Sequence, residues 1–295
     1  MSLVQPATPG LVIAAPRSSS GKTTLTLGLL RAFARRGVRV RGLKCGPDYI
    51  DPAFHGVAAG RSSLNLDAWA MEPALLAALA VEAGQGADLT LCEGLMGLFD
   101  GVPAPEGRSG SSVDVAAATG WPVLLVLDVS GQSQSAGAIV QGCVSYDPRI
   151  SIAGVILNKV GSERHRRLVT DAIARTGVPV LGSIPRDGQV SLPERHLGLV
   201  QASETQGLAD ILDRWVTQRD WKMPDIASPQ GGKVLRVGIA ATGGAPFDFI
   251  QDNEIVGVDV EIVKLTGRGE AVGIHVHKWR KTRSSLVGSG DNKRW

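Results

Sequence analysis

Short hydrophobic runs alternate with helix-like segments along the first 220 residues of the chain. These runs are rich in Val, Ile and Leu, and polar residues do not alternate with the apolar ones. Such continuous runs are typical of strands that are buried on both faces of a parallel sheet. The six expected strands span residues 11–15, 38–44, 88–92, 122–127, 152–157 and 178–184.

Helical periodicity separates several of these strands. It predicts helices over residues 22–36, 72–83 and 162–175, and Gly37 follows the first of them in the position of a natural C-terminal cap. Strands joined by helical crossovers form a doubly wound sheet with helices on both faces. The expected fold class is therefore α/β, with a doubly wound parallel sheet.

The pattern changes after residue 220. Two prolines and two glycines between residues 221 and 233 are typical of a linker, and strand-like runs follow at 234–239 and 256–263. After Lys264, Gly, Arg, Ser and Lys dominate, and we expect no element longer than a few residues. The expected organisation is a main domain over 1–220, a linker over 221–233, and, over 234–295, a short irregular C-terminal extension. That extension would be the remnant of a second domain with a basic, disordered tail.

Composition and charge exclude some classes of partner. The chain has 43% hydrophobic and 20% charged residues, and its 31 basic and 28 acidic residues leave a net charge of only +3. This charge is too small to indicate a nucleic-acid partner. No two of the three cysteines have metal-ligand spacing, no apolar run is long enough to span a bilayer, and no signal peptide is visible. We expect a reduced, cytoplasmic protein that does not bind membranes.

The strongest motif is the run Ala15-Pro-Arg-Ser-Ser-Ser-Gly-Lys-Thr-Thr24, between an expected strand and an expected helix. Backbone N–H groups of such a loop point at phosphate oxygens, and the helix adds the positive end of its dipole. Lys22 would reach the β- and γ-phosphates of ATP, and the Thr23 hydroxyl would ligate Mg²⁺. The usual first glycine is missing from this motif. The expected nucleotide-binding residues are Ser18, Ser19, Ser20, Gly21, Lys22, Thr23 and Thr24. The motif in this context predicts a P-loop NTPase-like fold, and this fold and loop resemble those of dethiobiotin synthetase.

Acidic residues follow two of the expected strands. Asp48 and Asp51 come after the second strand, and Glu93 and Asp100 after the third. Ligands of open α/β sheets bind beyond the carboxyl ends of the strands. Mg²⁺ is usually held by one or two carboxylates together with phosphate and water. We therefore expect these four carboxylates near the phosphate loop, some on the metal and some on a substrate, although each could instead cap a turn or helix.

Four further residues at the strand ends allow two interpretations each. His55 could contact an anionic substrate or fix its own loop, and Lys44 could counter phosphate charge or lie in solvent. Asp128 occupies a switch-type position but could be a cap. Asn158 could bond to the edge of adenine or be a turn residue.

Three segments carry a family resemblance: residues 16–24, the run Lys-Cys-Gly-Pro-Asp-Tyr-Ile-Asp-Pro-Ala-Phe-His over 44–55, and Glu-Gly-Leu-Met-Gly-Leu-Phe-Asp-Gly over 93–101. They resemble the motifs of the cobyrinic acid a,c-diamide synthase family, including its hydrogenobyrinic acid form. The second run is the most specific, because cobyric acid synthase and dethiobiotin synthetase share the phosphate loop but lack it. The resemblance covers about residues 10–240.

This resemblance implies a two-domain enzyme of cobalamin biosynthesis. The synthetase domain of the family uses ATP and Mg²⁺ to phosphorylate the a- and c-acetate carboxylates of a corrinoid. A glutamine amidotransferase domain releases ammonia, which displaces phosphate to give an amide. By position, the resemblance implies Lys22, Asp48, Asp51, Glu93 and Asp100 as catalytic, Thr23, Asp48 and Glu93 as metal ligands, Tyr49, His55 and Leu98 as substrate contacts, and Asn158 as a nucleotide contact.

The chain departs from this family after Ala241. No cysteine follows Cys143, so the nucleophile of a glutaminase domain is missing. We expect free ammonia to serve as the nitrogen donor, although a separate glutaminase could supply it. The sequence does not determine whether the protein is a homodimer, or whether its corrin substrate contains cobalt. The alternatives are a ligase similar to dethiobiotin synthetase, and a partitioning-type P-loop ATPase switch. Those ATPases often carry a second lysine early in the loop, where this chain has Arg17.

Overall fold

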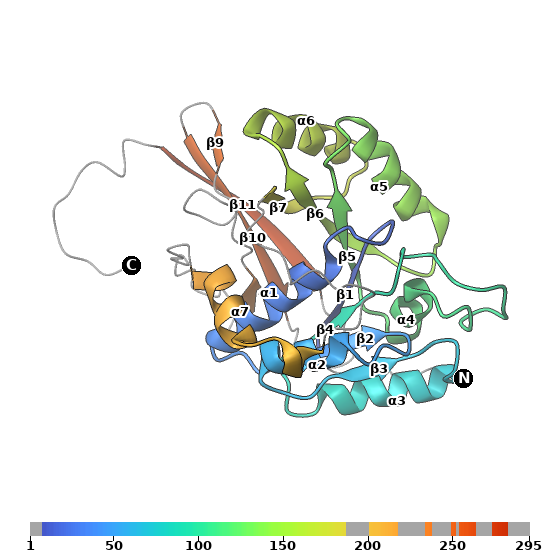
Figure 1. Ribbon diagram of the computed structural model, residues 1–295. Helices are drawn as coiled ribbons and strands as arrows, with labels where there is room; N and C mark the ends of the chain where they lie inside the picture. The colour runs from blue at the N-terminus through green and yellow to red at the C-terminus, as the bar shows by residue number, and fades with distance from the viewer. Residues whose placement is uncertain are drawn as a thin grey trace.

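The computed structural model describes residues 8–186 and 201–217 and four later strands within 234–282. Its main body is a seven-stranded, all-parallel sheet in the order β3-β2-β4-β1-β5-β6-β7 (Figure 1). The expected doubly wound α/β fold is confirmed. The strands are β1 Gly10–Ala14, β2 Val40–Cys45, β3 Leu64–Leu66, β4 Leu89–Glu93, β5 Val123–Asp128, β6 Ile152–Val160 and β7 Val180–Pro185.

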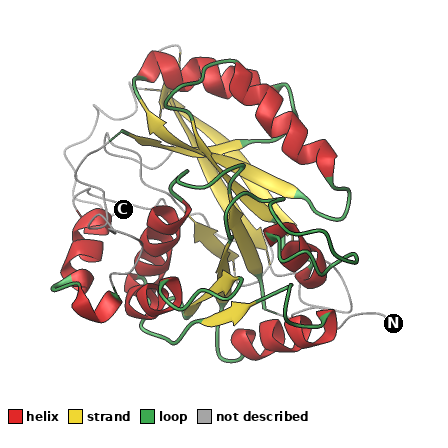
Figure 2. Ribbon diagram, turned by 45° about the vertical axis from the view of Figure 1, so that its right-hand side comes forward, coloured by secondary structure: helices red, strands yellow, loops and turns green. Residues whose placement is uncertain are grey.

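Helices cover both faces of this sheet (Figure 2). They are α1 Lys22–Arg35, α2 Asp51–Ala59, α3 Pro73–Gly84, α4 Ser112–Thr119, α5 Ser135–Tyr146, α6 Glu163–Ala174 and α7 Leu208–Thr217. Alternate residues of β1 point to opposite faces, as in any strand. Val12 joins a core with α3, α4, α5 and α6, whereas Ile13 joins a second core with α1, α2 and α7. Burial on both faces explains the continuous apolar runs in the sequence.

The helix α7 closes the second core. Leu208 and Leu212 are buried there, and Asp213 pairs with Arg31 at 2.6 Å and with Arg35 at 2.9 Å, both on α1. A fully buried leucine contributes about 1.5–3 kcal/mol, whereas partly exposed ion pairs contribute about 0–1 kcal/mol. Apolar packing therefore fixes α7 against α1, and the ion pairs set its orientation.

The C-terminal part contains more regular structure than we expected. Strands β8 Val234–Val237, β9 Phe249–Gln251, β10 Glu254–Val263 and β11 Gly273–Thr282 pair antiparallel, in the order β11-β10-β8, with β9 also on β10. The expectation of no substantial element after Lys264 is wrong, because β11 has ten residues. In the sequence of β11, apolar residues alternate only at Ile274 and Val276, and the basic residues that follow hide the strand pattern. The expected linker over 221–233 and the end of the basic tail lie outside the described residues.

Within the described part of the chain, none of the helices combines the length and the apolar character that crossing a bilayer requires.

Candidate nucleotide and acid site

The phosphate loop connects the end of β1 to the start of α1 at the carboxyl edge of the sheet. Arg17, Ser18 and Ser19 are exposed there, so the loop surface is open to a ligand. Gly21 has φ 96°, and a Cβ atom at this position would lie 2.1 Å from Nδ2 of Asn158. Only glycine satisfies both the left-handed backbone and the close approach. The glycine of the motif is therefore required by the local geometry.

Asn158, at the carboxyl end of β6, fixes the shape of this loop. Its Nδ2 donates to the carbonyl of Ser20 at 2.8 Å, and its Oδ1 accepts from the backbone N–H of Lys159 at 2.9 Å. The structure therefore gives Asn158 a positioning contact on the loop, and its expected contact with adenine stays a prediction.

The Lys22 side chain points into the space between the phosphate loop and the loop that follows β4. Its Nζ donates to the carbonyl of Met96 at 2.5 Å and to that of Arg17 at 3.4 Å. Met96 has φ 42°, a left-handed conformation that is unfavourable for its side chain. Burial lowers the pKa of Lys22, and the carboxylate of Glu93 opposes this shift. A buried ammonium held only by carbonyls is well suited to exchange them for phosphate oxygens.

Glu93, the last residue of β4, lies at the centre of a buried polar cluster. Its Oε1 accepts hydrogen bonds from Thr23 Oγ1 at 2.5 Å and Lys44 Nζ at 3.1 Å, and its Oε2 lies 2.7 Å from His55 Nε2. Burial opposes the ionisation of Glu93, but the charge of Lys44 and the bonds from His55 and Thr23 outweigh it. They hold the pKa of Glu93 at about 2. The carboxylate is therefore ionised and already next to a hydroxyl of the phosphate-binding helix.

The sheet register explains why Lys44 reaches this cluster. Lys44 on β2 is the direct neighbour of Glu93 on β4, and its Nζ also lies 2.8 Å from Oδ2 of Asp51. Burial and the charge of Glu93 raise the pKa of Asp51. Lys44 is thus buried between two carboxylates, and its interpretation as a solvated surface residue is wrong.

Asp48 caps the start of α2. Its Oδ1 accepts the backbone N–H groups of Ile50 at 2.8 Å and Asp51 at 3.0 Å, while its Oδ2 lies 3.9 Å from Lys44 Nζ. The interpretation of Asp48 as a turn or cap residue therefore holds for Oδ1. The other oxygen faces the buried cluster from its partly exposed side.

Asp100 belongs to a loop that packs directly on the phosphate loop. Its Oδ2 accepts the N–H of Gly97 at 2.8 Å, and a Cβ atom on Gly97 would lie 2.7 Å from the carbonyl of Pro16. The N–H of Leu98 donates to the carbonyl of Ala15 at 2.7 Å. These contacts place the exposed Asp100 beside the phosphate loop, as the sequence predicts.

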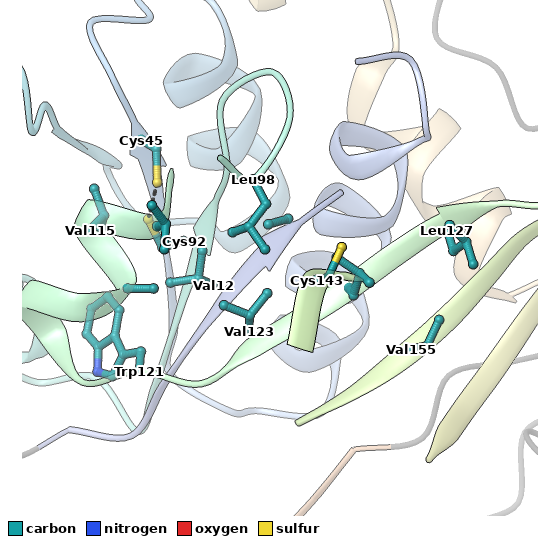
Figure 3. Close-up of a cluster of buried hydrophobic side chains, with 14 of the residues drawn as sticks. Val12, Cys45, Cys92, Leu98, Val115, Trp121, Val123, Leu127, Cys143 and Val155 are labelled. Carbon is teal, nitrogen blue, oxygen red and sulfur yellow. Dashed lines mark hydrogen bonds between the residues drawn. The ribbon is translucent and has the colours of Figure 1, made fainter. Parts of the chain in front are cut away.

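Two of the expected substrate contacts are buried in this structure. Leu98 is fully buried and lies in the apolar core with Val12 and Val123 (Figure 3). His55 is also fully buried, and its ring bonds to Glu93. Neither side chain lies at the surface in this structure, and the substrate contacts expected for Leu98 and His55 stay predictions. Tyr49, in contrast, has 69% of its surface exposed.

The two cysteines next to the site are packing residues. The Sγ atoms of Cys45 and Cys92 are 3.5 Å apart and buried, and they lie in the same apolar core (Figure 3). The contact with Cys45 and burial raise the pKa of the Cys92 thiol, which makes it a poor nucleophile.

One ionic cluster at this edge was not predicted. Asp128, at the end of β5, pairs with Arg17 of the phosphate loop at 3.1 Å and with Lys159, near the end of β6, at 2.8 Å. Its other oxygen accepts the N–H of Ser130. The sequence shows that Asp128 ends a strand, but these partners lie far from it along the chain, and no local pattern signals them.

The donor set at this edge fits Mg²⁺ with a nucleotide phosphate. Among the described residues, no three His, Cys, Asp or Glu side chains converge as a ready-made metal site. Mg²⁺ in nucleotide sites needs fewer protein ligands, because phosphates and water supply the rest. The hydroxyl of Thr23 and the ionised carboxylate of Glu93 are both oxygen donors, and they are already in contact.

The strand–loop–helix with its Gly-Lys-Thr run, and the buried carboxylate beside it, define a P-loop nucleotide-binding α/β protein. Residues 11–200 match the family model described as "CobQ/CobB/MinD/ParA nucleotide binding domain", and the chain belongs to this family.

Curated relatives carry a more specific name. The chain is 58% identical over 204 residues to a hydrogenobyrinate a,c-diamide synthase of Mesorhizobium japonicum, a match that covers 69% of this chain and 46% of the relative. It is also 58% identical over 206 residues to a synthase of the same name from Rhodobacter capsulatus, with 69% and 47% coverage. The chain thus spans about half the length of the curated relatives it matches. Among solved structures, chloroplast FtsY from Physcomitrella patens matches with a TM-score of 0.42 and 21% identity, over 72% of this chain and 67% of that one.

Proposed function

We propose that this chain carries the ATP- and Mg²⁺-dependent synthetase activity of a hydrogenobyrinate a,c-diamide synthase. It would amidate the a- and c-acetate carboxylates of hydrogenobyrinic or cobyrinic acid through an acyl phosphate, in cobalamin biosynthesis. The observation that supports this proposal best is the contact of Thr23 with Glu93, which joins the phosphate-binding helix to the acidic cluster. The names of the 58% identical relatives supply the substrate class.

The chemistry requires activation, because a carboxylate and ammonia do not form an amide at neutral pH by themselves. Transfer of the γ-phosphoryl group to a carboxylate oxygen depends mainly on positioning and on neutralising charge. Lys22 would exchange the carbonyl of Met96 for phosphate oxygens, and the loop amides would bind the same phosphates. Each such contribution is worth about 2–4 kcal/mol to the transition state.

Thr23 Oγ1 and Glu93 would hold Mg²⁺, which would neutralise phosphate charge when bound. Lys44 and His55 keep Glu93 ionised and in place for this role. The metal role expected for Asp48 remains a proposal, and its cap on α2 leaves one of its oxygens available.

The substrate would approach from the open side of the cluster. Asp48 and Asp100 are more exposed than Asp51 and Glu93, and Tyr49 extends from the same edge of the sheet. We assign Asp48, Asp100 and Tyr49 to positioning the acid substrate and ammonia. Ammonia then attacks the acyl carbon, phosphate leaves, and one proton is released as the amide forms.

The nitrogen donor of this chain would be free ammonia. Residues 144–295 contain no cysteine that could serve as the nucleophile of a glutaminase. Glutamine-dependent amidation by the purified chain alone would contradict this part of the proposal. In the cell, a separate glutaminase could supply the ammonia.

Phosphate release tests the proposal directly. The purified chain would be mixed with hydrogenobyrinic acid, ammonium and Mg-ATP, with the Lys22→Ala variant as the inactive control. We expect release that requires both the corrinoid and ammonium, together with formation of the diamide. Release with diaminopelargonic acid but not with the corrinoid would show a ligase similar to dethiobiotin synthetase. ATP hydrolysis that depends on a protein partner, and not on ammonium, would show a switch ATPase.

A further inference from the structure

Two cations share one carboxylate oxygen beside the phosphate loop. Nη2 of Arg17 lies 3.1 Å from Oδ2 of Asp128, and Nζ of Lys159 lies 2.8 Å from the same oxygen. The Asp128 side chain is only 2% exposed, whereas that of Arg17 is 61% exposed. One carboxylate neutralises one of the two cations, so the cluster keeps a net charge of +1 next to a loop that binds anions.

The position of Arg17 brings its side chain within reach of the phosphates. Its backbone carbonyl accepts Nζ of Lys22 at 3.4 Å and the hydroxyl of Ser20 at 3.0 Å. The backbone of Arg17 therefore adjoins the ammonium that would bind the β- and γ-phosphates. The long side chain of Arg17 is 61% exposed, so it has room to rotate away from Asp128 toward this ammonium.

The exchange of partners costs little. Only one end of the Arg17–Asp128 pair is buried: the guanidinium is largely exposed, so water stays available to it when it leaves the carboxylate. After Arg17 leaves, Asp128 still pairs with Lys159 and accepts the N–H of Ser130, so the buried carboxylate keeps its partners. Burial opposes the ionisation of Asp128, but the bonds from Lys159 and Ser130 outweigh it and hold its pKa at about 2. A guanidinium binds phosphate through two parallel hydrogen bonds, which is stronger and more directional than its single contact here.

We propose that Arg17 is a catalytic residue that leaves Asp128 when a nucleoside triphosphate binds and donates its guanidinium to the terminal phosphoryl group. Asp128 and Lys159 form its resting site. During transfer, the bond from the γ-phosphorus to the bridging oxygen breaks and a bond to the carboxylate oxygen of the substrate forms. Arg17 neutralises charge and moves no proton. The identity of the acceptor rests on the proposed function, whereas the contact with the terminal phosphate does not.

The test compares ATP with ADP, because only ATP carries the group that Arg17 would contact. Arg17→Gln and Arg17→Lys would be measured by calorimetry with Mg-ATP and Mg-ADP, and by phosphate release with the corrinoid. Arg39→Gln is the matched control: Arg39 is also an aspartate-paired arginine with a 60% exposed side chain, but it immediately precedes β2, at the amino-terminal edge of the sheet.

We expect Arg17→Gln to weaken ATP binding about tenfold more than ADP binding and to lower the turnover number about 100-fold or more. Arg17→Lys should recover part of both losses, and Arg39→Gln should change neither. Equal loss of ATP and ADP affinity in Arg17→Gln, or an unchanged turnover number, would overturn the proposal. Asp128→Asn, checked for its melting temperature, should keep the preference for ATP over ADP, because it removes only the resting partner.

The two proposals fail in different ways. If the wild-type chain distinguishes ATP from ADP through Arg17 but releases no phosphate with the corrinoid, the proposed substrate is wrong and the role of Arg17 stands. If corrinoid amidation occurs and Arg17→Gln supports it at the wild-type rate, the role of Arg17 is wrong and the function stands.

Discussion

The hydroxyl of Thr23 lies 2.5 Å from Oε1 of Glu93, so the first turn of α1 is hydrogen-bonded to the last residue of β4. This bond joins the two halves of the site. One half is the loop and helix that bind phosphate, and the other is the buried cluster of Glu93, Lys44, Asp51 and His55. A metal ion held between Thr23 and Glu93 would lie at this junction.

The Thr23 hydroxyl should matter for the metal more than for folding. Thr23→Val keeps the shape of the side chain and removes the oxygen, so the Mg²⁺ concentration needed for half-maximal activity should rise about ten- to a hundredfold. A titration of Mg²⁺ at constant ATP measures this shift. Thr23→Ser keeps the oxygen and should stay near the wild-type value. If Thr23→Ser and Thr23→Val shift equally, the methyl group is the important part and the metal role is wrong.

Replacing Lys22 should remove activity without unfolding the protein. Within the described part of the chain, the buried ammonium donates its hydrogen bonds to backbone carbonyls, and burial lowers the pKa of Lys22, so its charge does not stabilise the fold. Lys22→Met keeps the length of the side chain and should lower phosphate release about 100-fold or more. Its melting temperature should equal or exceed that of the wild type. A lower melting temperature together with lost activity would indicate that Lys22 acts through the fold.

Glu93 should contribute to stability in a way that depends on pH. Its folded-state pKa of about 2 lies below its ordinary value of 4.5, so ionised Glu93 stabilises the fold fully above about pH 4.5. This contribution is lost as the pH falls from 4.5 towards 2, because over this range the unfolded state takes up a proton that folded Glu93 takes up only near pH 2. Glu93→Gln lacks the charge at every pH and leaves Lys44 short of a partner, which should cost about 3–5 kcal/mol at neutral pH.

Thermal unfolding at a series of pH values checks this. The difference in melting temperature between the wild type and Glu93→Gln should be large at pH 7 and should shrink between pH 4.5 and 2. Because other carboxylates also titrate in this range, only the difference between the two proteins is informative. A difference that stays constant down to pH 2 would mean that Glu93 is not ionised in the fold.

The phosphate loop and the main sheet could be predicted because their signals are local. Gly21, Lys22 and Thr23 form a contiguous motif, and the buried strands appear as uninterrupted apolar runs. The ends of these runs also locate Glu93 correctly, because a parallel sheet brings the carboxyl ends of its strands to one edge. Local signals therefore determine where the site is.

The contacts among the side chains of the site could not be predicted in the same way. The segment from Asp51 to Ala59 forms α2, with Pro52 in its first turn and Phe54 buried in the core. The helix signal within it is weak because Gly56 interrupts a short segment, and the burial of Phe54 depends on distant parts of the chain. The depth of Leu98 and the partners of Asp128 depend on contacts between segments far apart in sequence. The residue types at the strand ends alone do not distinguish buried supporting side chains from exposed contacts.

Asn158 allows the sharpest distinction between two roles. Both polar atoms of its side chain already bond to the protein, at Ser20 and Lys159. If its role is to fix the phosphate loop, Asn158→Ala should weaken ATP and GTP binding by the same factor, about five- to tenfold, the value of one lost hydrogen bond.

Asn65→Ala is a suitable control for this variant. Asn65 also lies on a strand and donates to a loop carbonyl, that of Asp48, but it lies on β3 at the other side of the sheet. Calorimetry with both nucleotides decides the matter. We expect equal losses in Asn158→Ala and none in Asn65→Ala, whereas a loss confined to ATP would show that Asn158 contacts the adenine edge.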